Sequence, residues 1–257
     1  MMSKAKTLFY RSLFGGFDFC VQRVLRRRAT WNIQAGPFQG MCWGAVANCS
    51  LLTPKLLGTY EQELHGRLEQ FPVFDLVIDI GAAEGWYAVG ILHRHQARKV
   101  VAFEMADDGR ENLLANVRRN AVSPESIEVR SECTVDGLQT LLRSLPADSN
   151  FRLLIISDCE GFEGKLLAAD TLKLCANAYF IIETHDYFVP GVRERLTTTL
   201  AISHAVTDLR PVRRRRKDIS PNVPWLFRLP FLCRLLMSER RCPDIAWLVA
   251  VPKDVAG

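Results

Sequence analysis

The sequence predicts an α/β fold in which a mostly parallel, seven-stranded sheet carries helices on both faces. Three observations lead to this prediction. Short apolar runs rich in β-branched residues alternate with helical apolar patterns over residues 60–200, which is typical of consecutive βαβ units. The run that ends at Ile80 passes through two glycines into a helical pattern that begins at Trp86, as a buried parallel strand does at a ligand-binding turn. The next apolar strand ends in an acid, Glu104, about 20 residues downstream, where nucleotide-binding units place a ribose-binding carboxylate.

Capping signals and prolines set the expected helix ends, and apolar β-branched runs set the strands. Thr59 and Gln62 form a capping box, which predicts a helix from there to Phe71 that Pro72 stops. The expected strands are 76–80, 99–103, 127–130, 151–157, 178–183, 202–210 and 245–251.

The helices between the strands have similar start signals. Asp108 and Glu111 form a second capping box, Thr134 is a candidate N-cap, and Pro190 suits the first position of a helix. The expected helices are 86–95, 108 to beyond 117, 135–145, 163–168 and 190–200.

Two segments fall outside this alternation. Residues 1–57 are predicted to be a basic, partly helical N-terminal extension, with amphipathic helices at 8–28 and an irregular lead-in at 31–57. Residues 58–257 form the main domain, which carries a basic insertion at about 212–244. This insertion is too long for an ordinary connection, so it is expected to be a lid or part of a substrate wall.

Composition indicates a protein of the cytoplasm. No apolar run approaches the ~18–20 residues that cross a bilayer, and no secretion signal is recognisable. The 8 cysteines are scattered, without the spacing of a zinc site, which fits reduced, buried thiols. The net charge of +5 is concentrated in 26–28 and 213–217. Because no stacking aromatics interleave with these arginines, solvated loops or helix ends are favoured over a nucleic-acid platform.

Acidic residues gather where the predicted strands end. Parallel strands bring their carboxyl ends to one edge of a sheet, where ligands bind. The residues expected at this edge are Asp79, Gly81, Gly85, Glu104, Glu132, Cys133, Asp158, Cys159, Glu160, Glu183, Thr184, His185 and Asp186.

The turn after the first strand disfavours a dinucleotide. The three positions of a G-x-G-x-x-G fingerprint are Gly81, Ala83 and Trp86, so an indole occupies the position where a helix packs closely on a strand. Asp79 and Glu84 would also place negative charge beside a pyrophosphate. S-adenosylmethionine suits these acids better, because it carries an ammonium group, a sulfonium and a ribose diol but no phosphate.

On these residues the chain resembles a class I S-adenosylmethionine-dependent methyltransferase of the FkbM type. The resemblance covers roughly 58–190, in the family's order, and implies a Rossmann-like fold. Two positions depart from the family pattern, where Met105 replaces a proline and Glu84 an asparagine. The matching segments are 58–61, 77–87, 102–104 with Asn112, Leu113, Asn116 and Asn120, 158–163 and 182–185.

The resemblance implies cofactor contacts for the first two strand ends. Gly81 and Gly85, with Ala83 between them, would let the backbone approach the methionine portion of S-adenosyl-L-methionine. Asp79 would orient its ammonium group, directly or through water. Glu104 would accept hydrogen bonds from both ribose hydroxyls, which a carboxylate does well.

Four further positions complete the implied cofactor site. Glu132 and Cys133, after the third strand, would flank the adenine, with a purely structural role as the alternative. Tyr60 and Glu61 would close the pocket, with helix capping and packing as the alternative.

The acids and the histidine near the fourth and fifth strand ends are the candidates for catalysis. His185, Asp158 and Glu160 are candidate general bases for an oxygen acceptor, and His185 comes first because its ordinary pKa suits neutral pH. Alternatively, His185 is a packed strand-end histidine, or these three residues hold a divalent ion that ionises a hydroxyl. No metal ligand set is assigned from the sequence.

The predicted function is methyl transfer to a hydroxyl of a small molecule, sugar or lipid-linked acceptor. One alternative is a cofactor-binding protein without turnover. Another is an RNA methyltransferase that uses 213–217, although 158–161 lacks the Asn/Asp-Pro-Pro-aromatic signature of base-amine methylation. A nicotinamide oxidoreductase is the least favoured. No nucleic-acid partner is expected, peripheral membrane contact of the N-terminus remains open, and the sequence does not indicate an oligomeric state.

Overall fold

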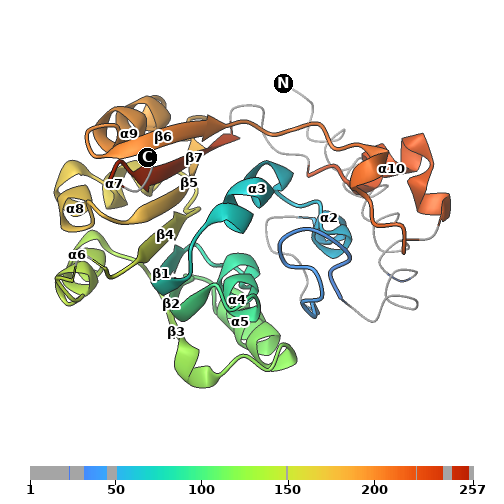
Figure 1. Ribbon diagram of the computed structural model, residues 1–257, viewed down its shortest axis with the longest axis horizontal. Coiled ribbons are helices and arrows are strands. Elements are labelled where there is room, and N and C mark those ends of the chain that lie inside the picture. Colours follow the sequence, from blue (N-terminus) through green and yellow to red (C-terminus); the bar gives the residue numbers. More distant parts are fainter. Residues whose placement is uncertain are drawn as a thin grey trace.

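The fold is built on a central sheet of seven strands in the order β3-β2-β1-β4-β5-β7-β6 (Figure 1). In this computed structural model β1 to β5 run parallel, and β7 is antiparallel to both of its neighbours. The predicted Rossmann-like, mostly parallel sheet is therefore confirmed. The structure describes residues 23, 32–44, 51–148, 150–223, 225–239 and 245–254. The strands are β1 (Phe74–Ile80), β2 (Ala97–Phe103), β3 (Ile127–Arg130), β4 (Leu153–Ser157), β5 (Tyr179–His185), β6 (His204–Leu209) and β7 (Ile245–Pro252).

Helices cover both faces of the sheet, as predicted (Figure 1). The buried residues of α2 to α5 form one apolar cluster with one face, and those of α6 to α9 form a second cluster with the other. Successive strand residues point to opposite faces, so Val77 joins the first cluster and Ile78 the second. The helices are α2 (Leu52–Leu57), α3 (Gln62–Gln70), α4 (Trp86–His93), α5 (Asp107–Arg119), α6 (Val135–Arg143), α7 (Glu163–Leu166), α8 (Ala169–Leu174) and α9 (Val192–Leu200), with the short η1 (Pro124–Ser126).

β1 occupies the middle of the sheet, between β2 and β4. Its residues from Leu76 to Ile80 are buried, which explains their nearly continuous apolar character. Chain order reverses between β1 and β4, because β2 and β3 lie on one side of β1 and all later strands on the other. The carboxyl ends of β1 and β4 are therefore the topological switch point, where open α/β sheets bind ligands.

One predicted N-cap is confirmed and one is wrong. Thr134 caps α6 by accepting a hydrogen bond from the Gly137 amide at 3.1 Å. Thr59 does not cap α3, which begins at Gln62. The reason is that the preceding helix is still closing there, since the amide of Thr59 donates to the carbonyl of Pro54 at 2.9 Å.

Two other expected helix starts shift by one or two residues. α5 begins at Asp107, and Asp108 lies inside its first turn, where its carboxylate accepts from the neighbouring Gly109 amide rather than forming a capping box. α9 begins at Val192 instead of Pro190, because the intervening Gly191 is the N-cap, in a left-handed conformation with φ 77°.

The expected irregular lead-in contains a helix, since all six residues of α2 are buried and helical. Its proline, Pro54, lies in the first turn, where a missing amide hydrogen does not break a helical bond. Upstream of it, Phe38 and Trp43 are buried in the same apolar cluster as α4. The described part of this segment therefore contributes to the core of the domain.

The insertion between β6 and β7 interrupts an antiparallel hairpin, because these two strands pair directly with each other. Its side chains Ile219, Val223 and Leu236 join the apolar cluster of α2 to α5, so the insertion folds back over that side of the molecule. Its described elements are η2 (Arg216–Asp218), η3 (Trp225–Arg228) and α10 (Pro230–Leu236).

The basic run at 213–217 is only partly solvated. Arg214 is almost buried and forms an ion pair with Glu63 of α3 at 3.0 Å and another with Glu239 at the end of the insertion. Its neighbours Arg213 and Arg215 are exposed, as expected. One arginine of the run therefore ties the insertion to α3.

Three remaining expectations concern cysteines, membrane spans and the N-terminus. The cysteines among the described residues are free thiols. No helix in the described ranges is long and apolar enough to cross a membrane. Apart from Arg23, the amphipathic helices expected at 8–28 lie outside the described residues, as do the basic run 26–28 and the last part of the insertion, 240–244.

Candidate functional site

The candidate site begins where β1 and β4 end side by side. The amide of Asp158 donates to the carbonyl of Ile80 at 2.9 Å, which continues the strand pairing beyond β4. Gly81 follows with φ 82°, and a β-carbon there would lie 1.9 Å from the carbonyl oxygen of Asp158. Only glycine fits, so this residue lets the first turn and the β4 end meet at the switch point.

The turn between β1 and α4 has a strained backbone. Gly81, Ala83 and Gly85 all have positive φ, and for Ala83, at φ 47°, this conformation is unfavourable. The amides of Gly81 and Ala82 both donate to the carbonyl of Phe103 at 2.9 Å, so the turn is fixed to the end of β2. The three predicted backbone positions therefore lie in one rigid loop.

Asp79 is a buried carboxyl near the end of β1, with 2% of its surface exposed. Burial raises its pKa to about 7. The backbone amide of Ala88 partly opposes this rise, and the charges of Asp158 and Glu104 add to it. Its Oδ2 atom is buried and has no hydrogen-bond partner within the described residues. A buried acceptor of this kind is suited to a donor brought in by a ligand.

Glu104, after β2, joins two loops of the site. One carboxylate oxygen accepts from the Ala83 amide and the other from the Ala106 amide, each at 2.8 Å. A carboxylate offers about four acceptor positions, so each oxygen keeps one for a further donor. Gly109 makes room for this side chain, because a β-carbon there would lie 2.8 Å from its Cγ.

Glu132 and Cys133, the two residues predicted to flank the adenine after β3, lie in different surroundings. Cys133 is buried in the apolar cluster of α6 to α9, and burial raises the pKa of its thiol to about 12. Glu132 is exposed. Of the two predicted adenine neighbours, only Glu132 has a side chain that is accessible to solvent.

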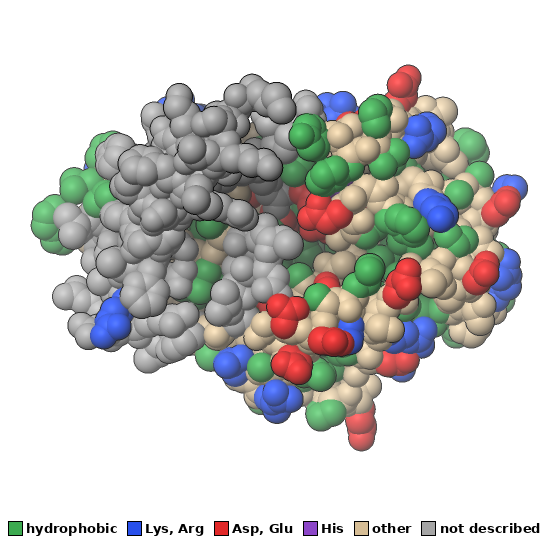
Figure 2. Space-filling model, turned by 180° about the vertical axis from the view of Figure 1, so that it is seen from behind, with side chains coloured by type: hydrophobic (Ala, Val, Ile, Leu, Met, Phe, Trp, Pro, Cys, Tyr) green, Lys and Arg blue, Asp and Glu red, His purple; other side chains and the backbone are tan. Residues whose placement is uncertain are grey.

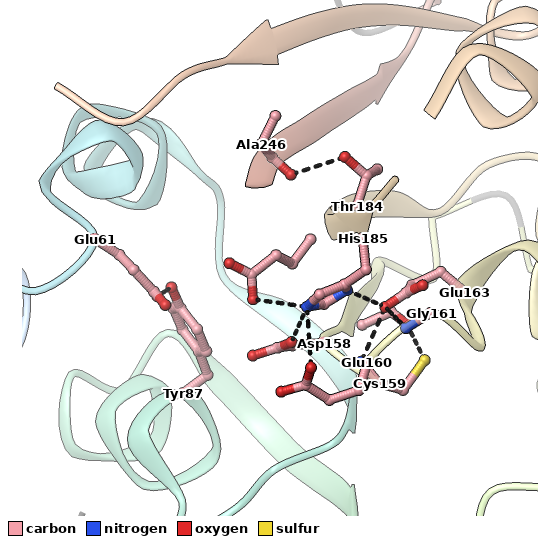
Figure 3. Close-up of polar contacts among 12 residues, drawn as sticks. Glu61, Tyr87, Asp158, Cys159, Glu160, Gly161, Glu163, Thr184, His185 and Ala246 are labelled. Atoms are coloured by element: carbon pink, nitrogen blue, oxygen red, sulfur yellow. Dashed lines mark hydrogen bonds and ion pairs between the residues drawn. The ribbon is translucent and has the colours of Figure 1, made fainter. Parts of the chain in front are cut away.

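Tyr60 and Glu61 lie between α2 and α3, and both are buried. Glu61 has φ 50° and accepts a hydrogen bond from the hydroxyl of Tyr87 in α4. Its amide donates to Glu239 of the insertion at 3.0 Å. Figure 3 shows Glu61 and Tyr87 at the left of the view and Asp158 and His185 near its centre. The α3 start, α4 and the insertion therefore meet at one point beside the site.

A buried ion pair that the sequence did not suggest lies beneath Tyr60. Lys55 of α2 forms an ion pair with Glu84 of the β1–α4 turn at 2.5 Å, and both side chains are buried. The lysine Nζ lies 4.8 Å from the ring centre of Tyr60 and 5.6 Å from those of Trp43 and Trp86. Glu84 is therefore a partner for this enclosed lysine. The two residues are 29 positions apart, so no local pattern could reveal the pair.

We expect Lys55→Met to destabilise the protein by about 3–5 kcal/mol, because it removes one charge of a buried pair. Urea unfolding measures this change. Lys165→Met, which removes an exposed lysine that lies over the ring of Phe162, should change stability by less than about 0.5 kcal/mol. The double variant Lys55→Met/Glu84→Gln should recover most of the loss. Equal effects of Lys55→Met and Lys165→Met would contradict this prediction.

His185 ends β5 and is the centre of a cluster of four carboxylates. Its Nδ1 lies 2.7 Å from Glu163, and its Nε2 lies 3.6 Å from Asp158, 3.7 Å from Glu160 and 3.8 Å from Glu183. The ring lies between Glu163 on one side and Asp158 and Glu160 on the other (Figure 3). The three predicted catalytic residues are therefore brought together.

Glu183 and Glu163 complete this cluster, although neither was among the predicted catalytic residues. Glu183 and His185 are two positions apart in β5, so their side chains point to the same side of the strand. The intervening Thr184 points away and donates to the carbonyl of Ala246 at 3.1 Å. Strand alternation is the signal that could have identified Glu183.

The protonation of His185 is set by opposing effects. Burial lowers its pKa, but the hydrogen bond and charge of Glu163 and the charges of Asp158 and Glu160 outweigh burial, so its pKa is raised. For Glu163 the effects have the opposite signs. Burial raises its pKa, but its contacts with His185 and with backbone amides outweigh burial, so its pKa is lowered.

Acidic side chains also gather on one face of the molecule. The face opposite to that of Figure 1 carries several of them in and around a hollow near its centre (Figure 2). Such a surface repels phosphates and attracts cations or hydrogen-bond donors.

Comparison with known proteins gives likenesses of fold. No family model matches the chain, and no curated protein does. Precorrin 8W decarboxylase from Methanobacterium thermoautotrophicum has 14% identity and a TM-score of 0.46, with 75% of this chain and 89% of that chain covered. A precorrin-6y methyltransferase from Geobacter metallireducens has 9% identity and a TM-score of 0.47, covering 76% and 88%. A tRNA methyltransferase from B. subtilis has 14% identity and a TM-score of 0.45, covering 74% and 65%. Function is therefore inferred from the site residues.

Proposed function

We propose that the chain is an S-adenosylmethionine-dependent methyltransferase that acts on a hydroxyl group. The observation that carries this proposal is the pair of carboxylates at the switch point. Asp79 keeps a buried oxygen without a partner, and Glu104 keeps free acceptor positions at the end of the next strand. An ammonium group and a ribose diol supply the donors that these two acids require.

The residues of the turn fit the same ligand. Gly81 and Gly85 both have left-handed backbone conformations, and the lack of a β-carbon at Gly81 leaves no side chain between the loop and the end of β4. Asp79 and Glu104 would repel a pyrophosphate placed here, which disfavours a nicotinamide dinucleotide. We assign the cofactor's methionine end to this turn and its ribose to Glu104.

The remaining cofactor contacts follow from position. Glu132 is the exposed residue after β3 and would contact the adenine, with Cys133 packed behind it. Tyr60 and Glu61, held by Lys55 and Tyr87, would close the pocket on the side of α3.

The acidic cluster around His185 would activate the acceptor. When bound, S-adenosylmethionine supplies a methyl group on a good leaving group, so the protein has to align the acceptor and remove its proton. Asp158, Glu160 and His185 are the groups that can take this proton, which Glu160, the most exposed of them, can pass to solvent. The acceptor class that we propose is a small molecule, a sugar or a lipid-linked hydroxyl, methylated in the cytoplasm.

An RNA methyltransferase is the second candidate, and one observation favours it. Arg213, Arg215 and Arg216 are exposed and, with Arg214, line a cavity of about 420 Å³ in the insertion. Such a site attracts phosphates. Transfer of radiolabelled methyl groups to total RNA, compared with transfer to glycosides and lipid extracts, distinguishes these acceptors.

Calorimetry tests the cofactor assignment. S-adenosylmethionine and S-adenosylhomocysteine should bind with one site per chain, and NAD should not bind. Glu104→Ala should weaken binding by more than about 100-fold, because it removes two hydrogen bonds to a charged group worth about 1.5–3 kcal/mol each.

Two further variants separate binding from folding. Glu104→Gln keeps the shape of the side chain and one acceptor oxygen, so a smaller loss of affinity is expected. Glu111→Ala, on the exposed side of α5, should leave affinity unchanged. Unchanged affinity in Glu104→Ala would remove the ribose assignment, and NAD binding would contradict the proposed cofactor.

A further inference from the structure

A hydrogen bond between Nδ1 and Glu163 holds the His185 ring in one orientation. Glu163 is fully buried, and its Oε1 accepts from Nδ1 at 2.7 Å and from the amides of Cys159 and Gly161 at 3.2 Å. This network places the proton on Nδ1 and turns Nε2 toward the other carboxylates. A carboxylate that fixes the tautomer in this way is the usual support of a metal-binding histidine.

On the other side of the ring, Nε2 has acidic neighbours at distances that are too long for hydrogen bonds. The separations of 3.6 Å to Asp158 and 3.8 Å to Glu183 exceed the usual limit of about 3.2 Å. One ligand atom from each of these three residues lies within 4.8 Å of the others. Two ligands at about 2.1 Å from a common ion lie roughly 3.0–3.8 Å apart, which matches the two distances.

A second observation points to a ligand at this place. Asp158 Oδ1, the atom that faces Nε2, is buried and has no hydrogen-bond partner within the described residues. The His185 side chain itself is 97% buried, since 3% of it is exposed. No lysine or arginine in the described part of the chain forms an ion pair with Asp158, Glu160 or Glu163. Within the described residues, the ion-pair partner of Asp158, Glu160 and Glu163 is therefore the same imidazole.

We propose that Asp158, Glu183 and His185 bind one divalent metal ion. Two carboxylate oxygens and one imidazole nitrogen suit a cation such as Mn²⁺ or Fe²⁺, and the absence of a thiolate from this set disfavours soft metals. In the divalent-ion alternative considered from the sequence, Glu160 was the third ligand; here Glu183 replaces it. Glu160, more exposed and with φ 54°, stays beside the ion as a proton acceptor.

This assignment deepens the proposed function and, for its catalytic role, rests on it. A divalent ion with three protein ligands has open positions, one of which can hold the oxygen of a hydroxyl and lower its pKa. Such an ion would bind catechols, vicinal diols and α-hydroxy acids most tightly, because two oxygens of one acceptor molecule can bind it together. The structure thus narrows the substrate class to a hydroxyl beside a second oxygen ligand.

In the test, the full chain is treated with a chelator and then titrated with Mn²⁺ alone. Binding is measured by calorimetry and by the electron paramagnetic resonance signal of free Mn²⁺. We expect one saturable site per chain. Glu183→Gln and His185→Gln should each weaken Mn²⁺ binding by more than about 100-fold, and Glu163→Gln by about 10–100-fold through loss of the ring's support. Asp170→Asn, an exposed carboxylate on α8, is the matched control and should change affinity less than twofold.

Because Glu183 and His185 are buried, Asp158→Asn provides a partly exposed alternative, and circular dichroism verifies the fold of each variant. Absence of saturable Mn²⁺ binding by the wild type would overturn the proposal, as would unchanged affinity in folded Glu183→Gln and Asp158→Asn. Calorimetry with S-adenosylmethionine on the same samples keeps the two proposals apart. A variant that loses Mn²⁺ binding but still binds S-adenosylmethionine supports the metal site. A wild type that binds Mn²⁺ but not S-adenosylmethionine contradicts only the proposed methyltransferase function.

Discussion

Asp79→Asn should make the protein more stable at pH 8 and weaken its binding of S-adenosylmethionine by about 100-fold. The carboxyl is buried, and its pKa is raised to about 7. Loss of a charged hydrogen bond to the ammonium group, worth about 3 kcal/mol, accounts for the change in affinity. Calorimetry and urea unfolding of the same samples measure both effects.

The pH dependence of stability has a definite sign. A carboxyl whose pKa is higher in the folded state binds its proton more tightly when folded, so the protein loses stability as pH rises from about 4 to 7. Above 7 the penalty is complete, and for the shift of Asp79 it is of order 1–4 kcal/mol. Asparagine has no such penalty, so the gain in stability should be large at pH 8 and small at pH 4.

Cofactor affinity should change in the opposite direction. In the proposed site the Asp79 carboxylate binds the ammonium group, so wild-type affinity should be about tenfold weaker at pH 6 than at pH 8, where the group is ionised. Asp79→Asn should show little of this dependence. An affinity that rises from pH 6 to pH 8 equally in both proteins would assign the titration to another group.

Gly81→Ala should destabilise the protein by more than about 3 kcal/mol and abolish cofactor binding. The added methyl group would lie 1.9 Å from the carbonyl oxygen of Asp158, and φ 82° is unfavourable for any residue with a β-carbon. Since neither backbone can move without breaking the pairing of β1 with β4, the strand ends must separate. Thermal unfolding and calorimetry measure the two losses.

Gly66→Ala is the matched control for this substitution. Gly66 lies inside α3, and a β-carbon there would have open space around it. Alanine should therefore stabilise the protein by about 0.5–1 kcal/mol through its higher helix propensity. Equal destabilisation by both substitutions would show that the close approach at Gly81 is not the cause.

The sheet could be predicted from the sequence because its signals are local. The strand Ile127–Arg130 has the predicted bounds, and β1, β4 and β5 differ from prediction by at most two residues at either end. Each is a short β-branched run between polar breaks. The acids that follow these strands were predictable for the same reason, since parallel strands bring their carboxyl ends together.

The start of α3 could not be predicted, because two turns compete for the same residues. Threonine is a residue type favoured at N-caps, but Gly58, at φ 73°, ends α2 immediately before Thr59. No sequence pattern indicated α2, whose proline and buried lysine are unusual in a helix of the core. Lys55 is tolerated there only because Glu84, distant in sequence, lies beside it.

The membership of the acidic cluster was predictable only in part. Asp158, Glu160 and His185 were expected together, but the role of Glu163 depends on how its short helix folds back beneath the ring. Glu183 follows from strand alternation with His185, which requires that β5 extend to His185, two residues beyond its predicted end.

The position of the insertion has a consequence for how this chain could diversify. It leaves β6 and returns to β7, and these strands are paired neighbours, so its two ends are held close whatever its length. Each doubling of such a loop costs only about 0.6 kcal/mol in closure entropy. Lengthening or replacement of the segment would therefore leave the register of the sheet and the β1–α4 turn intact, while changing the surface beside Glu61. Under the proposed function, acceptor preference could thus vary among descendants of this fold independently of the chemistry at the strand ends.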